Sequence, residues 1–260
     1  MPNVSALLLA AGLGTRLRPL TENWPKCLMP VANRPLLEYW LGIISRAGIN
    51  DVLVNLHYHP EIVRDFLYRP QFREWVKTVY EPDLMGTAGT LRENADFFHN
   101  KTVLLVHADN WCCCDFSGFL NFHHNSRPAN TVMTMMTFES QDPSSCGIVE
   151  LDAQGIVQGF HEKVKNPPGK LANAAVYLLE PEVIEWIETH PAITDFSTQV
   201  LPHLIGRIAT WQNRGVHRDI GTVEVLKEAQ NDKCELSPWT VDDEWQNEFM
   251  KHPIHQQIKT

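Results

Sequence analysis

The sequence predicts an α/β protein, a layered sandwich of helices on a mostly parallel central sheet. Short apolar runs alternate with helical patterns as far as Asp109. Such alternation implies parallel strands joined by right-handed crossovers. After about Asn130, closely spaced strand patterns with a turn at Ala153–Gly155 indicate a smaller mixed, partly antiparallel region added to the parallel core.

The first half of the chain supplies the parallel core. Val4–Ala11 is an apolar run that ends at Gly12 and is typical of a buried strand. Pro35–Ala47 has helical spacing and is followed by Gly48, a good C-cap residue. A proline near its start favours a helix over 59–68. The remaining predictions are strands at 49–56, 74–81 and 101–109 and a helix at 87–98.

The second half adds strands at 130–138, 147–152, 155–163 and 171–180, then helices at 181–189 and 222–230. The segments 196–205, 207–212 and 215–221 lie between these helices. No linker-like stretch, repeat or low-complexity segment interrupts the chain, so we expect a single domain over residues 1–230. The polar tail, 231–260, either packs on that domain or forms a contact surface through Trp239, Trp245 and Phe249.

Composition excludes several classes of function. Of 260 residues, 43% are hydrophobic and 20% charged, as in soluble globular proteins. Lys and Arg number 22 against 31 Asp and Glu, a formal charge of −9. This acidity argues against nonspecific binding to nucleic acid or an anionic membrane, but not against a local phosphate site. No signal-like segment and no apolar run near the roughly 20 residues of a membrane span is present, so we expect a cytoplasmic protein.

Six cysteines include the consecutive Cys112, Cys113 and Cys114. Neighbouring cysteines make poor disulfide partners and there is no CxxC pair, so this usage indicates a reducing compartment. Nearby histidines, His107, His123 and His124, raise the alternative of a zinc site, but the spacing fits no standard one. We interpret the three cysteines as a strand end with small packed side chains.

A glycine-rich turn with basic residues, LLLAAGLGTRLRPLTENWPKCLMP, follows the first strand. The dinucleotide fingerprint fails because Leu17 stands where its third glycine belongs, and no G-K-[ST] string completes a P-loop. A purely structural turn would explain the glycines but neither Arg16 nor Lys26. Bare backbone N–H groups and two cations instead suit a triphosphate.

This stretch resembles the nucleotide-binding signature of the sugar-1-phosphate nucleotidyltransferases, or NDP-sugar pyrophosphorylases, with its G-x-G-T-R-L-x-P-L-T and P-K elements. The resemblance extends from about Val4 to Gln230. It implies a three-layer Rossmann-like sandwich of the nucleotide-diphospho-sugar transferase type. The nucleotide contacts implied are Leu9, Ala10, Ala11, Gly12, Gly14, Thr15, Arg16, Lys26, Glu81, Gly86 and Thr87.

Further motifs follow in the family's order: EPDLMGTAGTL for the nucleobase, VLLVHADN, CGIVELD, GFHEKVKNP, LANAAVYLL and GVHRDIGT. Taken singly, each is more typical of a surface loop, a core strand or a helix start capped by Thr87 or Thr222. Their order implies substrate contacts from Asn110, Gly147, Glu162, Lys163 and Asn173. It also implies catalytic roles for Arg16, Lys26, Asp109, Lys163 and Asp219.

Asp109 and Asp219 are implied to hold Mg²⁺, since two carboxylates with substrate phosphates suit that ion. Five positions depart from the usual family residues: Ala108, Cys146, Val164 (which replaces a proline), Ala175 and His217. The implied reaction joins an NTP to a sugar-1-phosphate and releases pyrophosphate. GTP with a mannose- or heptose-type phosphate is favoured, because EPDLMGTAGTL looks most like the guanylyltransferase branch.

Uridylyl, thymidylyl or cytidylyl transfer and a small non-sugar phosphate acceptor stay open. So does another class, a regulatory subunit that binds an NDP-sugar without turnover. The departures favour that class, whereas the retained Arg16, Lys26, Asp109, Lys163 and Asp219 favour an enzyme. The sequence leaves the oligomeric state open, and a homo-oligomer is compatible with the aromatic tail.

Overall fold

The computed structural model describes residues 3–234 and 243–258. The chain divides into two compact units. Unit 1 comprises the residues up to Leu7 together with Met85–Val106 and Asp115–Arg214, and unit 2 comprises Leu8–Leu84, His107–Cys114 and the residues from Gly215 on. The expectation of one domain over residues 1–230 remains a prediction.

Unit 1 is built on strands of the sheet that pair with one another antiparallel, apart from one parallel pair. They are β6 (Thr102–His107), β8 (Met133–Glu139), β9 (Gly147–Leu151), β10 (Val157–Glu162), β11 (Leu171–Leu179) and β12 (Ile208–Gln212). The order is β10-β9-β11-β6, with β8 beside β11 and β12 parallel to β8. The helical segments are α3 (Thr87–Glu93), α4 (Ala95–Phe98), α5 (Phe116–Asn125), α6 (Pro181–Glu188), α7 (Leu201–Leu204), and the short turns η4 (Pro143–Ser145) and η5 (Phe196–Val200).

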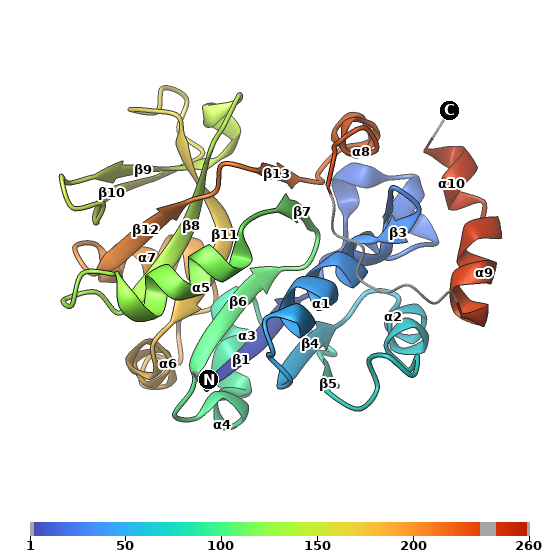
Figure 1. Cartoon of the computed structure of the whole chain (residues 1–260), viewed down its shortest axis with the longest axis horizontal. Coiled ribbons are helices and arrows are strands. Elements are labelled where there is room, and N and C mark those ends of the chain that lie inside the picture. The colour runs from blue at the N-terminus through green and yellow to red at the C-terminus, as the bar shows by residue number, and fades with distance from the viewer. Residues whose placement is uncertain (1–2, 235–242, 259–260) are drawn as a thin grey trace. The chain divides into compact units, whose positions relative to one another are not determined.

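Unit 2 contains the parallel pair β4 (Val52–Leu56) and β5 (Val76–Tyr80), which follow β1 (Val4–Leu9) in the strand order (Figure 1). Two short ribbons join it, β2 (Pro30–Val31) with β3 (Arg34–Pro35), and β7 (Asn110–Cys113) with β13 (Val216–Asp219). Its helical segments are α1 (Leu36–Arg46), α2 (Pro60–Leu67), α8 (Val223–Ala229), α9 (Glu244–Lys251), α10 (Ile254–Gln257), η1 (Thr15–Leu17), η2 (Leu20–Glu22) and η3 (Lys26–Leu28).

The predicted α/β class is confirmed, with antiparallel pairing after Asn130 as expected. β1 and β6 are buried along most of their length because their apolar runs leave no face for water. Most predicted elements lie within a few residues of the observed ones. Thr222 caps α8 as expected, because its hydroxyl accepts a hydrogen bond from the Val225 N–H at 3.4 Å.

Helix α5 was not predicted from the sequence. Its signals are present, since Asp115 caps the helix by accepting the Gly118 N–H at 2.9 Å. Phe116, Phe119 and His123 form its buried face at helical spacing. The helix begins directly after the run of cysteines, whose own pattern is that of a strand end. That interpretation of the cysteines is confirmed by β7, which ends at Cys113.

A disulfide joins Cys113 to Cys234 across 121 residues of chain. The cysteine pattern had suggested free thiols in a reducing compartment, and the structure differs for this pair. The three consecutive cysteines form no disulfide with one another, as expected, and Cys112 and Cys114 are free. Sequence spacing alone gave no sign that Cys234 would approach β7, with the two Cα atoms 6.0 Å apart. Among the described helices, none has the length and apolar character needed to span a membrane.

The described part of the tail packs on unit 2. Trp245 of α9 contacts Phe66 of α2 with ring centroids 4.9 Å apart, and α9 lies alongside α2 in Figure 1. Phe249 stacks on Trp24 at 5.7 Å. Trp239, the third aromatic residue noted in the tail, lies outside the described residues.

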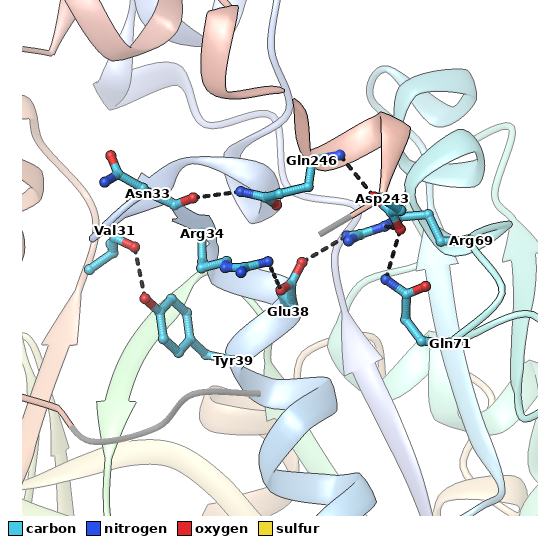
Figure 2. Close-up of polar contacts among 9 residues, drawn as sticks. All are labelled: Val31, Asn33, Arg34, Glu38, Tyr39, Arg69, Gln71, Asp243 and Gln246. Atoms are coloured by element: carbon cyan, nitrogen blue, oxygen red, sulfur yellow. Dashed lines mark hydrogen bonds and ion pairs between the residues drawn. The ribbon is translucent and has the colours of Figure 1, made fainter. Parts of the chain in front are cut away.

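A buried polar network fixes the start of α9 (Figure 2). Arg69 donates to Glu38 at 2.7 Å and to Asp243 at 2.7 Å, and Gln246 donates to the Asn33 carbonyl at 3.0 Å. The Glu38 side chain is fully buried and also accepts from Arg34 at 3.2 Å. A buried carboxylate needs such partners, and this network therefore ties α1, the segment just after α2 and the N-cap of α9 together.

We expect Glu38→Ala to lower the free energy of unfolding by about 3–5 kcal/mol, because it leaves the buried Arg69 guanidinium without one of its two carboxylates. Urea denaturation measures the change. Glu188→Ala, an exposed carboxylate on α6, is the control and should change stability by less than about 0.5 kcal/mol. A loss below about 1 kcal/mol for Glu38→Ala would show that the network contributes little.

Candidate active site

The glycine-rich loop begins where β1 ends. The Ala10 N–H donates to the Asn55 side-chain carbonyl at 2.7 Å, which fixes the first residue of the loop. Gly14 has φ +61°, and a Cβ there would approach the Thr21 methyl group to 2.7 Å. Glycine is therefore required at this position both by backbone conformation and by space. Thr15 begins the short helical turn η1, which carries Arg16.

Lys26 lies at the centre of the site. Its side chain is 8% exposed, and its Nζ lies 2.6 Å from Asp109 Oδ2 and 3.3 Å from Asp219 Oδ1. Lys26 is held by η3, which follows the extended Pro25. One ammonium group thus bridges two carboxylates that are 110 residues apart in the sequence, from 109 to 219.

The ribbon of β7 and β13 brings the two carboxylates together. Asp109 directly precedes β7, Asp219 is the last residue of β13, and the register pairs Asp219 with Asn110. Asn110 is buried, and its carbonyl accepts the Trp40 indole N–H at 2.9 Å. Antiparallel pairing therefore places the end of one strand beside the start of the other.

Arg16 adds a second cation. Its Nη2 lies 3.1 Å from Asp219 Oδ2, and its side chain is 65% exposed. Gly221 makes room for it, since a Cβ at that position would lie 2.6 Å from Arg16 Nη1. Lys26 is thus enclosed by protein, whereas the Arg16 guanidinium is open to a ligand from solvent.

The charges shift one another's protonation. Burial lowers the pKa of Lys26, but Asp109 and Asp219 outweigh burial and the pKa is raised above its ordinary value. Burial raises the pKa of Asp219, but Lys26 and Arg16 outweigh it and the pKa is lowered. Lys26 is therefore a cation and Asp219 an anion at neutral pH.

Glu81, expected to contact the nucleotide, is buried with 1% exposure. Its carboxylate accepts from the Asn55 amide at 2.9 Å, and the same Asn55 accepts the Ala10 N–H. Asn55 was not singled out from the sequence. The available signal was a polar residue in the otherwise apolar strand VLVNL, and a buried amide of this kind needs partners.

The expected nucleobase segment belongs to unit 1. Gly86 has φ +77°, and a Cβ there would lie 2.5 Å from the Thr194 carbonyl oxygen. Helix α3 begins at Thr87, but the N-cap position is Gly86, and the Thr87 hydroxyl accepts the Phe196 N–H at 2.7 Å instead. The alternative of Thr87 as a helix cap was therefore wrong, because its hydroxyl binds the backbone of Phe196 and makes no capping hydrogen bond to α3.

The expected sugar-side residues also belong to unit 1. Glu162 pairs with Gly147 in the register of β10 and β9, and a Cβ on Gly147 would lie 2.6 Å from the Glu162 carboxylate. Lys163 Nζ lies 3.4 Å from Glu162 Oε1 and is largely exposed. The structure thus brings Gly147, Glu162 and Lys163 together around one carboxylate.

Asn173 lies on β11, where its amide donates to the Tyr177 hydroxyl at 2.6 Å and its carbonyl accepts the Ala175 N–H at 2.9 Å. Ala175 has φ +53°, in the left-handed region. This backbone gives a physical reason for the glycine that the family usually has there, since glycine adopts such angles without strain.

The site's donor set is consistent with a divalent ion. Two aspartates converge on one cation, the Lys26 ammonium, and Mg²⁺ usually binds one or two protein carboxylates with substrate phosphates completing its shell. In the part of the chain that the structure describes, no group of three or more His, Cys, Asp or Glu side chains is placed to hold a metal ion. A divalent ion here would therefore need ligands from the substrate as well as from protein.

Comparison with known proteins identifies relatives. The family model described as nucleotidyl transferase matches residues 5–235. A mannose-1-phosphate guanyltransferase 2 of Candida glabrata is 30% identical over 226 residues, which cover 84% of this chain and 61% of the relative. The mannose-1-phosphate guanylyltransferase of Mycobacterium tuberculosis is 30% identical over 85% of this chain and 62% of its own length. The chain thus spans about three fifths of the length of these relatives.

A solved structure described as a glucose-1-phosphate thymidylyltransferase from Bacillus anthracis, in complex with sucrose, has a similar fold. The TM-score is 0.77 at 21% sequence identity, and the match covers 94% of this chain and 99% of that one. The family match includes the glycine loop, Lys26, Asp109 and Asp219. The chain therefore belongs to the nucleotidyl transferase family.

Proposed function

We propose that the protein is a sugar-1-phosphate nucleotidyltransferase that forms an NDP-sugar and pyrophosphate from an NTP and a sugar-1-phosphate. The observation that carries this proposal is the convergence of Lys26, Arg16, Asp109 and Asp219 next to the glycine loop. Family membership supports the same class of reaction. Such a cluster suits a reaction in which negative charge moves between phosphates.

The chemistry depends on positioning and charge. An oxygen of the sugar phosphate attacks the α-phosphorus of the NTP, and the bond to the pyrophosphate breaks in line with it. The attacking phosphate is already an anion near pH 7, so no strong general base is required. The obstacle is to bring two polyanions together and to stabilise the departing pyrophosphate.

Each basic residue has a role in this proposal. The exposed Arg16 stabilises the leaving pyrophosphate. When the nucleotide binds, the Lys26 side chain moves from the two aspartates, and its ammonium group then contacts the α-phosphate. Backbone N–H groups of Ala11–Thr15 receive the phosphates, while Leu9 and Ala10 lie at the start of the loop and Asn55 and Glu81 hold it from behind. Lys163 aligns the sugar phosphate, while Glu162 and Asn173 contact sugar hydroxyls and Gly86 the base.

Asp109 and Asp219 would hold Mg²⁺, and enzymes of this family generally use a divalent metal. When bound, the ion offsets phosphate charge and orients the phosphate oxygens. The two carboxylates already converge on one cation in this structure, which is the arrangement that such a site needs.

GTP and mannose-1-phosphate are the substrates we favour, because the matched curated relatives are named as mannose-1-phosphate guanylyltransferases. A heptose-type phosphate, another nucleotide and the role of a non-catalytic NDP-sugar-binding subunit are the competing assignments. We further infer a cytoplasmic location from the absence of a signal-like segment, against which stands the Cys113–Cys234 disulfide, since disulfides are rare in the cytosol.

A panel of NTPs against sugar-1-phosphates, read by pyrophosphate release, tests the function directly. We expect release with GTP and mannose-1-phosphate at a kcat/KM at least about tenfold above the other pairs, since specific buried contacts commonly discriminate by this much or more. Release with another pair only would change the substrates but keep the reaction. No release with any pair, together with tight binding of an NDP-sugar, would favour the regulatory class.

Lys26→Ala or Asp109→Ala should lower kcat about a hundredfold or more, because losing one charge-stabilising group in such a site typically costs about 2.7–4 kcal/mol. Steady-state kinetics with saturating Mg²⁺ measures this, and circular dichroism checks the fold. Glu188→Ala serves again as the matched control. Near-normal turnover by purified Asp109→Ala protein would contradict the assignment.

Gly221→Ala tests Arg16 without altering its charge. The new methyl group would displace the Arg16 guanidinium, because a Cβ at position 221 would lie 2.6 Å from Arg16 Nη1, and the flexible side chain can move at little cost in stability. We expect kcat to fall at least about tenfold with an unchanged melting temperature. Gly169→Ala, with no atom within 4 Å of its new carbon, is the control. Equal activity of both variants would remove Arg16 from the proposed mechanism.

A further inference from the structure

The side chains of Asn173 and Tyr177 on β11 are in direct contact although four positions separate them in the sequence. In a regular strand, the Cα atoms of residues this far apart lie about 13 Å from each other. Here the Asn173 amide donates to the Tyr177 hydroxyl at 2.6 Å. The strand is therefore irregular between these two residues.

The irregularity is a bulge in β11. Against β8, Asn173 pairs with Thr137 and Tyr177 pairs with Met135, so the three residues between them on β11 face one residue of β8. Ala175 lies inside the bulge with φ +53°, an uncommon conformation for a residue with a side chain, which persists only where its surroundings hold it. Because a bulge re-aims the side chains next to it, this one brings Asn173 and Tyr177 together.

The bulge also fixes the orientation of the Asn173 amide. Its carbonyl oxygen accepts the Ala175 N–H at 2.9 Å. A backbone N–H can only donate, so the NH2 group of the amide is the end that faces Tyr177. The NH2 group has a second hydrogen and the carbonyl oxygen a second lone pair for a ligand. Since Asn173 is only half-buried, a ligand can reach these groups.

Tyr177 is a firm support for this amide. Its side chain is fully buried, its ring centroid lies 4.9 Å from that of Phe196, and the Ser197 side chain is a further hydrogen-bond partner of its hydroxyl. Burial raises the pKa of Tyr177 more than the hydrogen bonds with Asn173 and Ser197 lower it, so the group is a neutral phenol at neutral pH. Phe196 is held in turn, because its N–H donates to the Thr87 hydroxyl at 2.7 Å.

Asn173 lies in one row of the sheet with two other residues expected on the sugar side. Strands β11 and β9 pair antiparallel at Ala172 and Ile148, so the next position sets Asn173 beside Gly147. Gly147 pairs on its other side with Glu162. Side chains of one row point to the same face of a sheet, and the glycine has none. Asn173 and Glu162 therefore stand on either side of a gap in the row.

We propose that Tyr177 is a positioning residue for the sugar phosphate. It does not touch the substrate but holds the Asn173 amide in the one orientation in which that amide meets a sugar hydroxyl. This inference rests on the proposed function and on the contact between Asn173 and the sugar. Without the Tyr177 hydroxyl, one end of the amide loses its partner, and small misplacements of a contact group weaken binding strongly. The nucleotide makes no use of Asn173 in this arrangement, so the effect is confined to the sugar.

Tyr177→Phe tests the inference by steady-state kinetics, with the substrate pair that the NTP and sugar-1-phosphate panel identifies. We expect the KM for the sugar phosphate to rise about tenfold while the KM for the NTP stays unchanged, because only the sugar contact is disturbed. Tyr39→Phe is the matched control, since Tyr39 is also buried and its hydroxyl donates to the Val31 carbonyl at 2.9 Å in unit 2. It loses a hydrogen bond of the same kind and should leave both KM values unchanged.

Side-chain amide resonances of Asn173 test the geometry without any substrate. Asn173→Asp identifies them, because it removes one pair of signals from the ¹H–¹⁵N correlation spectrum. Tyr177→Phe should shift this pair, whereas Tyr39→Phe should leave it in place. An unshifted pair in Tyr177→Phe would show that the hydroxyl does not hold the amide, and would overturn the inference whatever the kinetics.

Failure of the proposed function has a different signature, namely no pyrophosphate release by the unaltered chain with any pair. Calorimetric titration with GDP-mannose then takes the place of kinetics, and Tyr177→Phe should weaken its binding about tenfold while GTP binding stays the same. The inference is overturned if an active unaltered chain and Tyr177→Phe share the same KM for the sugar phosphate, or if the KM values for both substrates rise alike. It is also overturned if an inactive chain binds no GDP-mannose, or binds it equally with and without the Tyr177 hydroxyl.

Discussion

The buried ammonium of Lys26, held between Asp109 and Asp219, is the interaction on which the candidate site depends. Removing one amine from water is costly unless opposite charges surround it, and here two carboxylates outweigh the cost. Three separate segments of unit 2 must therefore meet for any one of these charges to be tolerated. Under the proposed function, the same arrangement also assembles the charges that a phosphate transfer needs.

The carboxylates in turn depend on backbone pairing. The ribbon of β7 and β13 sets Asp219 beside Asn110, so that the two aspartates approach without a long loop to position them. Further along the ribbon, Arg218 is ion-paired with Asp232 at 2.6 Å, and the Trp111 indole donates to the same carboxylate at 3.0 Å. The segment after α8 is thereby held against the strands that carry the site.

The loop that carries Lys26 also contacts the tail. Trp24 packs against the described part of the tail, which the Glu38–Arg69–Asp243 network fixes to α1 and α2. The described part of the tail thus packs aromatic side chains against Trp24, two residues before Lys26. The tail is polar with scattered aromatic residues, and its composition alone did not predict that it would pack on unit 2.

Much of the fold was predictable, because apolar periodicity and end signals are local. Val4–Ala11 and Pro35–Ala47 were found from such patterns, and β1 and α1 lie within them. Helix α5 was missed although Asp115 and the spacing of Phe116 and Phe119 marked it. Asn55 and the Cys113–Cys234 pair were missed for a different reason, since their partners are distant in sequence.

The sequence by itself determined the alternation of strands and helices, the need for glycine at the loop and the types of charged residue available for phosphate chemistry. Only the tertiary structure decided which charges meet: that Lys26 bridges Asp109 and Asp219, that Arg16 stays open to solvent, and that Glu81 supports the loop from behind through Asn55. The physical reason is that side-chain pairing depends on strand register and burial, which join residues as distant as Arg16 and Asp219, 203 positions apart, whereas sequence patterns report only neighbours a few residues away.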